Sequence, residues 1–310
     1  MLRRALLAVA ASEQIRELVT ATPATRAVVG RYVAGDSISD AVRVARSLRA
    51  AGLLVTLDYL GEDATDSRLA ADTATQYVQL LGKLAADGLT EDGAVEVSVK
   101  PTAVGLLLDE PMATGHIERI AIAAGEAGTT VTVDAEDHRT TDAGLRIATA
   151  LRSRLPFVGS VVQSSLRRTE ADVRELAAPG VRVRLCKGAY AEPVSEAFAS
   201  RHEVDKSFAR CLRILMSGPG YPMIATHDPR LIEITTSLAL HRPGGRDPAS
   251  FEHQMLYGVR PAEQRRLAAT GAQVRVYVPY GSDWYGYLVR RLAERPANLA
   301  FFLRSLWSVS

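Results

Sequence analysis

The sequence is poor in cysteine: among its 310 residues only Cys186 and Cys211 occur. Two cysteines are too few for a disulfide framework, and Cys186 lies in an apolar run typical of a strand, so we expect a reducing compartment such as the cytoplasm. An excess of one charge is also lacking, because 37 basic residues are balanced by 35 acidic ones. This balance disfavours a nucleic-acid-binding protein, which needs a clustered basic surface.

Long apolar runs are absent as well. No stretch of about 18 apolar residues occurs, so the sequence predicts no membrane-spanning helix. Residues 1–11 have two arginines followed by an apolar stretch, as a signal peptide does, but they continue directly into the helical pattern of residues 12–18. We therefore expect an amphipathic helix of the mature fold, whose Arg3 and Arg4 are compatible with peripheral contact to a membrane.

What the sequence does contain is a regular alternation of short apolar runs with amphipathic segments such as residues 67–84 and 142–155. We expect eight strands, at residues 53–59, 95–100, 130–134, 158–163, 181–187, 223–226, 251–256 and 273–278. Eight strand–helix units predict a parallel sheet that closes into a (β/α)8 barrel. A doubly wound open sheet is the alternative. The expectation is one α/β domain, 1–310, with residues 1–48 as its N-terminal helical region.

Polar residues end most of these runs on their C-terminal side. They are Lys100, Asp134, Gln163, Arg184, Lys187, Thr226, His227 and Tyr277. In a (β/α)8 barrel the C-terminal strand ends and the loops after them build the active site. The pattern therefore predicts an enzyme with a charged, polar site.

Two segments give more detail. After the last strand, a turn at residues 279–281 leads into a helix on which Tyr287, Arg290, Arg291 and Glu294 share one face. Two neighbouring guanidinium groups suit the binding of a carboxylate. In the fifth strand, alternation places Arg182 and Arg184 on one side and Val183 and Leu185 on the other.

The fifth strand also carries a recognisable motif. Residues 184–190, Arg-Leu-Cys-Lys-Gly-Ala-Tyr, resemble the Arg-Leu-Val-Lys-Gly-Ala-Tyr pattern of the proline dehydrogenase family, and the helix motif from Tyr287 to Glu294 is similar to that family's C-terminal helix. Similar pieces follow the family order at residues 99–102, 133–136, 163, 225–227 and 254–258. The resemblance extends over nearly the whole chain.

The resemblance implies a distorted (β/α)8 barrel that binds FAD non-covalently, with the last helix over the flavin. The implied reaction is the oxidation of L-proline to 1-pyrroline-5-carboxylate by hydride transfer to flavin N5, the first step of proline catabolism to glutamate. The implied partners are a quinone electron acceptor and a separate pyrroline-5-carboxylate dehydrogenase, for which this chain is too short. A quinone acceptor would bring a cytoplasmic protein to the inner membrane surface as a peripheral protein.

The resemblance also assigns roles to residues. The implied carboxylate-binding residues are Lys100, Arg290 and Arg291. The residues expected around the proline ring are Leu185, Tyr190 and Tyr277. Asp134 would order the site beside Lys100, and Arg184 would lie near flavin N5. The implied FAD contacts are Ala135, Gln163, Arg184, Lys187, Gly188, Ala189, Thr226 and His227. Ala191 departs from the family, in which many members have Trp.

Other uses of these residues remain open at this stage. The group formed by Asp134, Glu136, Asp137 and His138 could bind a divalent ion, although a loop after the third strand explains it better, and no metal is expected. Lys100 or Lys187 could serve a Schiff-base aldolase. A non-catalytic sensor of proline or flavin is the third hypothesis. No glycine fingerprint of a dinucleotide-binding fold is present.

Overall fold

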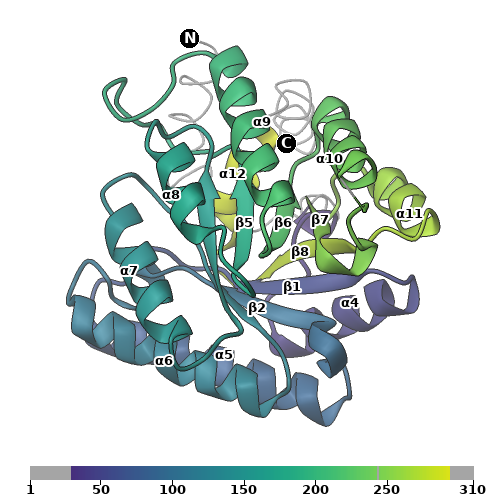
Figure 1. Cartoon of the computed structure of the whole chain (residues 1–310). Helices are drawn as coiled ribbons and strands as arrows, with labels where there is room; N and C mark the ends of the chain where they lie inside the picture. Colours follow the sequence, from purple (N-terminus) through teal and green to yellow (C-terminus); the bar gives the residue numbers. More distant parts are fainter. Residues whose placement is uncertain (1–28, 243, 294–310) are drawn as a thin grey trace, which may run out of the picture.

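The protein is a closed barrel of eight parallel strands in the order β1 to β8 (Figure 1). The computed structural model describes residues 29–242 and 244–293, and in residues 289–293 the backbone alone. The strands are β1 (Leu54–Tyr59), β2 (Val95–Val99), β3 (Val131–Val133), β4 (Val158–Gln163), β5 (Arg182–Cys186), β6 (Tyr221–Ala225), β7 (Glu252–Leu256) and β8 (Val274–Tyr280). β8 pairs in parallel with β1, from Leu54 opposite Arg275 to Tyr59 opposite Tyr280. This closure confirms the predicted barrel and excludes the open sheet.

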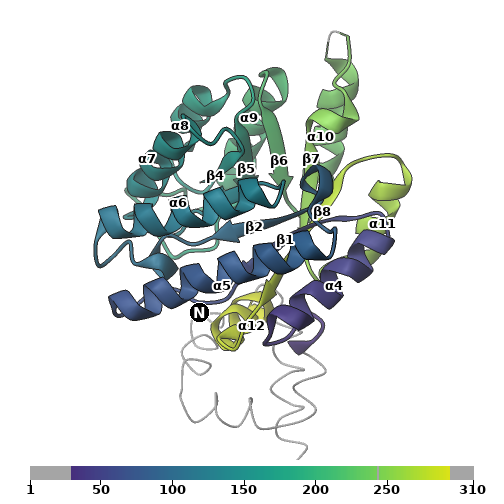
Figure 2. The same ribbon diagram turned by 90° about the horizontal axis from the view of Figure 1, so that it is seen from below.

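Helices form an outer ring around the strands (Figures 1 and 2). The helices of the described residues are α4 (Ile38–Ala50), α5 (Ser67–Ala86), α6 (Glu110–Glu126), α7 (Thr141–Arg152), α8 (Thr169–Leu176), α9 (Arg201–Ser217), α10 (Pro229–His241), α11 (Pro261–Ala269) and α12 (Trp284–Ala293). Several begin where the sequence supplies an N-cap: Ser37 and Asp40 form a capping box at α4, and Asp109 caps α6. Short 3-10 turns occur at η1 (Glu91–Gly93), η2 (Thr102–Val104) and η3 (Pro248–Ser250).

The apolar core lies between the strands and these helices. Outward-facing valines of β1, β2 and β8 pack with α4, α5 and α6 in one cluster, and Val183 and Leu185 of β5 pack with α8 and α9 in a second cluster. Successive residues of a strand point to opposite faces, so the alternate residues point into the barrel. Those inward residues are mostly polar.

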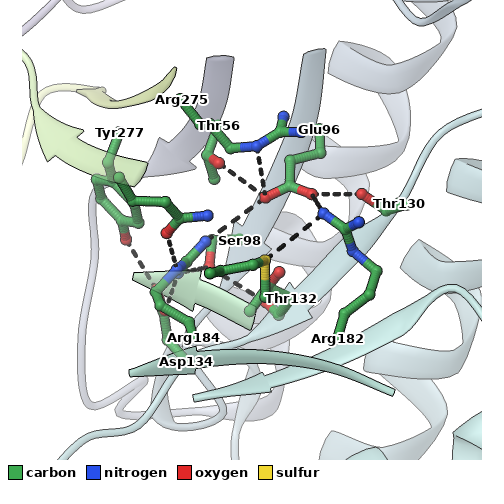
Figure 3. Close-up of polar contacts among 12 residues, drawn as sticks. Thr56, Glu96, Ser98, Thr130, Thr132, Asp134, Arg182, Arg184, Arg275 and Tyr277 are labelled. Carbon is green, nitrogen blue, oxygen red and sulfur yellow. Dashed lines mark hydrogen bonds and ion pairs between the residues drawn. The ribbon is translucent and has the colours of Figure 1, made fainter. Parts of the chain in front are cut away.

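A buried ionic network fills the barrel interior (Figure 3). Glu96 lies 3.2 Å from Arg182, 3.5 Å from Arg184 and 3.8 Å from Arg275. Arg275 also pairs with Glu252 at 2.8 Å. Burial raises the pKa of Glu96, but Arg275, Arg182 and Arg184 together lower it to about 2. The carboxylate is therefore ionised at neutral pH.

The predicted strands agree with the structure to within about two residues, and β6 and β8 differ most. β6 begins two residues earlier than expected, and β8 ends two residues later. β8 continues past Val278 to Tyr280, because neighbouring segments of the same chain supply hydrogen-bond partners. The amide of Leu60 donates to the Tyr280 carbonyl at 2.8 Å, and the amide of Ala34 donates to the Pro279 carbonyl at 2.9 Å. The strand ends before Gly281, whose φ of 119° favours glycine. The helix predicted within residues 1–18 lies outside the described residues. Among the described helices, none is both long and apolar enough to cross a bilayer.

Candidate active site

A cavity of about 750 Å³ opens at the C-terminal ends of the strands. All eight strands or the loops after them contribute to its wall, and α12 adds Tyr287. This is the face on which barrel enzymes carry their active sites. The position of Tyr287 also places α12 against the cavity, as expected for the C-terminal helix.

Most residues that the sequence singled out meet at this cavity. Those in its wall are Lys100, Asp134, Ala135, Gln163, Arg184, Lys187, Gly188, Ala189, Tyr190, Thr226, His227 and Tyr277. Arg290 and Arg291 belong to α12, but their side chains lie outside the described residues. Leu185 does not reach the cavity. It is fully buried among Val183, Phe208 and Leu212 on the helix side of β5, so the expected contact with the proline ring is not supported.

Lys100 lies at the cavity as one half of a buried ion pair. Its Nζ is 2.7 Å from Oδ1 and 2.6 Å from Oδ2 of Asp58, which is 1% exposed. Burial alone would lower the pKa of Lys100, but the charges of Asp58 and Asp134 raise it above its usual value. Lys100 is thus a permanent cation. An ammonium has three donors, so the pair leaves one for a ligand.

Arg184 is held by a set of inward-facing side chains. Its Nη1 donates to Asp134 Oδ1 at 2.7 Å and to Ser98 Oγ at 2.9 Å, and its Nε donates to Gln254 Oε1 at 2.6 Å. Tyr277 donates to the other oxygen of Asp134 at 2.7 Å, and its ring centroid is 5.2 Å from the guanidinium carbon (Figure 3). These contacts fix the planar guanidinium in one orientation.

The loop after β5 forms another part of the wall. Lys187 Nζ lies between Asp205 of α9 at 2.6 Å and Asp228 after β6 at 3.0 Å. The next residue, Gly188, has a φ of 97°, and a Cβ there would meet Ser165 Oγ at 2.3 Å. Two features therefore favour glycine at position 188: the positive φ of its backbone, and the lack of room for a Cβ atom beside Ser165.

Several wall residues were missed by sequence reasoning. Asp58, the last residue but one of β1, pairs with Lys100. Gln254 orients Arg184, and Leu256 ends β7 at the cavity. Asp58 could have been predicted as a cavity residue from the sequence, because it is a charged residue near the end of an apolar strand run, as Lys100 and Asp134 are. Gln254 and Leu256 lie within the segment 254–258, which the family resemblance did point out.

The acidic residues of the loop after β3, which the sequence offered as possible metal ligands, make hydrogen bonds and ion pairs with other side chains. Glu136 accepts hydrogen bonds from Thr102, and His138 Nδ1 lies 2.5 Å from Glu192 of the loop after β5. Asp137 pairs with Arg139. Over the described ranges, no three His, Cys, Asp or Glu side chains are grouped closely enough to hold a metal.

Comparison with known proteins identifies the family of the chain. The family model described as proline dehydrogenase matches residues 41–304. The chain is 36% identical over 307 residues to proline dehydrogenase 1 of Bacillus subtilis subsp. natto, which covers 99% of both proteins. The chain belongs to the proline dehydrogenase family. The proline dehydrogenase of Deinococcus radiodurans is 35% identical over 309 residues, covering 98% of this chain and 97% of that protein.

Solved structures share the fold of this chain. Proline utilization A from Bdellovibrio bacteriovorus, described as inactivated by N-propargylglycine, superposes with a TM-score of 0.77 and 26% identity over 86% of this chain. This chain spans about a third, 32%, of that protein. Family membership makes the chain an oxidoreductase that acts on proline, in proline catabolism.

Proposed function

We propose that the chain oxidises L-proline to 1-pyrroline-5-carboxylate with FAD as its cofactor. The observation that carries the proposal is the arrangement of Lys100, Asp134, Arg184 and Tyr277 in one cavity of a proline dehydrogenase barrel. In this reaction the hydrogen of a ring C–H bond leaves as a hydride with the bonding electron pair. The nitrogen lone pair forms the C=N bond, and the nitrogen loses its proton. When bound, the flavin supplies the hydride acceptor, N5.

Lys100 is our first candidate for binding the substrate carboxylate. Its charge is maintained by Asp58, and one ammonium donor remains after the two contacts with that carboxylate. Arg290 and Arg291, one helix turn beyond Tyr287, are proposed to bind the same carboxylate. Three cations would fix the ring in one orientation, and their field would lower the pKa of the proline amine toward its reactive neutral form.

Tyr277 and Tyr190 are proposed to enclose the proline ring, while Asp134 orders the site. Asp134 bridges Tyr277 and Arg184, so it couples a side chain proposed to touch substrate to one proposed to lie near the flavin. Both partners donate to it, so Asp134 is the acceptor in each contact. It therefore acts here through the orientation of its neighbours.

The residues around the cavity fit a flavin. The volume of about 750 Å³ lies in the range of cofactor pockets. Arg184 lies in the cavity wall, and its guanidinium is held in place by Asp134, Ser98 and Gln254, so it presents a fixed positive charge beside the bound cofactor. Residues proposed to hold FAD are Ala135, Gln163, Arg184, Lys187, Gly188, Ala189, Thr226 and His227.

The lysines argue against the Schiff-base alternative. An aldolase lysine must lose its proton to attack a carbonyl. The raised pKa of Lys100 opposes that loss, and Lys187 is held between two carboxylates. Neither side chain is prepared for nucleophilic attack.

We propose further that the chain works as one barrel domain, passes electrons to a quinone, and depends on a separate pyrroline-5-carboxylate dehydrogenase. The last point is supported by the relative from Bacillus subtilis subsp. natto, which is named for proline dehydrogenation alone and matches this chain over 99% of its length. A quinone acceptor would make the protein a peripheral partner of the membrane from the cytoplasmic side.

The visible spectrum of the purified protein under anaerobic conditions tests the proposal. The expected result is an oxidised flavin spectrum that bleaches when L-proline is added, and bleaches far less in Arg290→Ala or Arg291→Ala protein. N-propargylglycine should abolish the bleaching over time, and excess proline should slow that loss. A protein that takes up FAD but is not reduced by proline would instead be a sensor, and one that cannot bind FAD would contradict the proposal.

A further inference from the structure

A chain of hydrogen bonds joins three consecutive loops and the end of β4 at the cavity rim. The amide of Asp63, after β1, donates to Thr102 Oγ1 at 3.1 Å. Thr102, after β2, contacts both carboxylate oxygens of Glu136: Oγ1 donates to Oε1 at 2.6 Å and the amide donates to Oε2 at 2.9 Å. The Glu136 carbonyl accepts from Gln163 Nε2, at the end of β4, at 2.6 Å. Glu136, after β3, is the centre of this chain.

Each of these four segments carries a residue of the cavity wall within two positions of its link in the chain. Glu62 precedes Asp63, Lys100 lies two residues before Thr102, and Asp134 lies two residues before Glu136. Gln163 is itself in the wall. Glu136 is 6% exposed and is not part of the wall. Its contacts therefore act on the cavity through the loops that they join.

We infer that Glu136 is a positioning residue, which sets the place of Lys100 relative to Asp134 and Gln163. The inference rests on the proposed function, because Lys100 is proposed to bind the substrate carboxylate and Gln163 the cofactor. The Glu136 carboxylate accepts hydrogen bonds from both the amide and the hydroxyl of Thr102. These two bonds fix the separation of the loops after β2 and β3 more tightly than packing alone would.

The hydrogen bonds between Glu136 and Thr102 can be kept by one variant of Glu136 and removed by another. Burial raises the pKa of Glu136 to about 7, with Thr102 and Lys100 lowering it and Glu62 raising it. The protonated acid can still accept from the Thr102 amide and can donate to Thr102 Oγ1, so both protonation states keep the link. A glutamine has the same two abilities. Glu136→Gln should therefore preserve the chain, and Glu136→Ala should break it.

A matched control lies at the other end of the same strand pair. Thr129, just before β3, is buried and donates from Oγ1 to the carbonyl of Val95, the first residue of β2, at 2.8 Å. Thr129→Ala removes one buried link between the two strands far from the cavity. Its loss of stability should resemble that of Glu136→Ala, without an effect on the site.

The experiment measures KM and kcat for proline in the flavin-loaded enzyme, FAD affinity by fluorescence titration of the stripped protein, and Tm. For Glu136→Ala we expect KM to rise at least about tenfold and FAD affinity to fall, because small displacements of positioning groups have large effects. Glu136→Gln should stay within about twofold of the wild type, and Thr129→Ala should lower Tm alone.

Other outcomes decide against the inference. Wild-type KM and FAD affinity in a less stable Glu136→Ala protein would make the role purely structural, and a Glu136→Gln protein as impaired as Glu136→Ala would refute the link. If Glu136→Ala does not fold, Thr102→Val removes only the Oγ1 contacts and should raise KM to a smaller extent; an unchanged KM there overturns the inference. A wild type that does not oxidise proline refutes the proposed function instead, while the FAD titrations still test Glu136.

Discussion

The ion pair of Asp58 and Lys100 shows how a single residue joins stability to function. Both side chains are almost fully buried, so each charge needs the other to offset its lost hydration. Such a pair adds little stability over an apolar pair, but removal of one partner leaves an uncompensated charge. We expect this pair to be retained because the cavity needs a cation that stays charged.

A double variant separates the two roles of Lys100. Lys100→Met should raise KM for proline by about tenfold or more. It should also lower the free energy of unfolding by about 3–5 kcal/mol, because Asp58 stays buried without its partner. Asp58→Asn combined with Lys100→Met should recover most of that stability, measured by urea unfolding, while KM stays high. Recovery of KM in the double variant would show that Lys100 does not bind substrate.

Leu185 shows where the role that the family resemblance implies and strand alternation point in different directions. It lies between Arg184 and Cys186, two residues of the cavity wall. Strand alternation turns it to the opposite face, where it packs against α9. The alternation was readable from sequence and correctly separated Arg184 from Leu185. An apolar residue that does reach the cavity, Leu256, lies two strands further along the barrel.

At the level of elements, the loop after β5 depends on Gly188. The positive φ lets the chain turn directly after the strand, so that Lys187 and Tyr190 both line the cavity. Backbone contacts tie the loop to its neighbour after β4: the amide of Ser165 donates to the carbonyl of Lys187 at 2.8 Å, and the amide of Phe198 donates to that of Ser165 at 2.8 Å. A change at Gly188 should therefore affect ligand binding before it affects the fold.

Gly188→Ala tests this dependence. The methyl group would collide with Ser165 Oγ, and the left-handed backbone costs alanine about 1–2 kcal/mol. We expect weaker FAD binding and a Tm lowered by only a few degrees, measured by flavin titration and thermal melting. Ser165→Gly in the same protein removes the collision but not the backbone cost, so it should restore FAD affinity in part. Full-strength FAD binding by Gly188→Ala alone would contradict a tight fit of this loop.

The elements were largely predictable, whereas their pairing was not. Most strands are short runs rich in apolar residues with a turn signal beside them, so their existence follows from local sequence. Contacts such as that of Thr56 with Glu96, 40 residues apart, depend on the register between strands, which local patterns do not encode. For the same reason the Lys100 partner Asp58 and the links of Glu136 emerged only from the structure.

At the scale of the whole molecule, the barrel interior is unusual because it contains several charged side chains. Branched apolar residues commonly fill such interiors in layers. Here Glu96 and Glu252 are buried with Arg182, Arg184 and Arg275. The network continues from Arg184 to Asp134 at the cavity. The interior thus supports the site electrostatically, and the apolar core outside the strands provides the burial that holds the barrel together.

Glu96→Gln tests whether this network holds the barrel together. Loss of one carboxylate among three arginines should lower the free energy of unfolding by about 3–5 kcal/mol near neutral pH. The pKa of Glu96 is lowered to about 2 in the fold, so its contribution is present above about pH 4.5 and is lost as the pH falls toward 2. The difference between wild type and Glu96→Gln in urea unfolding should therefore shrink on acidification.

A surface ion pair gives the control for that experiment. Glu118 lies 2.7 Å from Arg154, with 31% and 62% of the two side chains exposed. Glu118→Gln removes the same charge from a screened position and should change stability by less than about 1 kcal/mol at any pH. Equal effects of the two variants would mean that water screens the barrel interior as it screens the surface. Glu96 could not then stabilise the barrel through its charge, and the orientation of Arg184 would rest on Asp134, Ser98 and Gln254 alone.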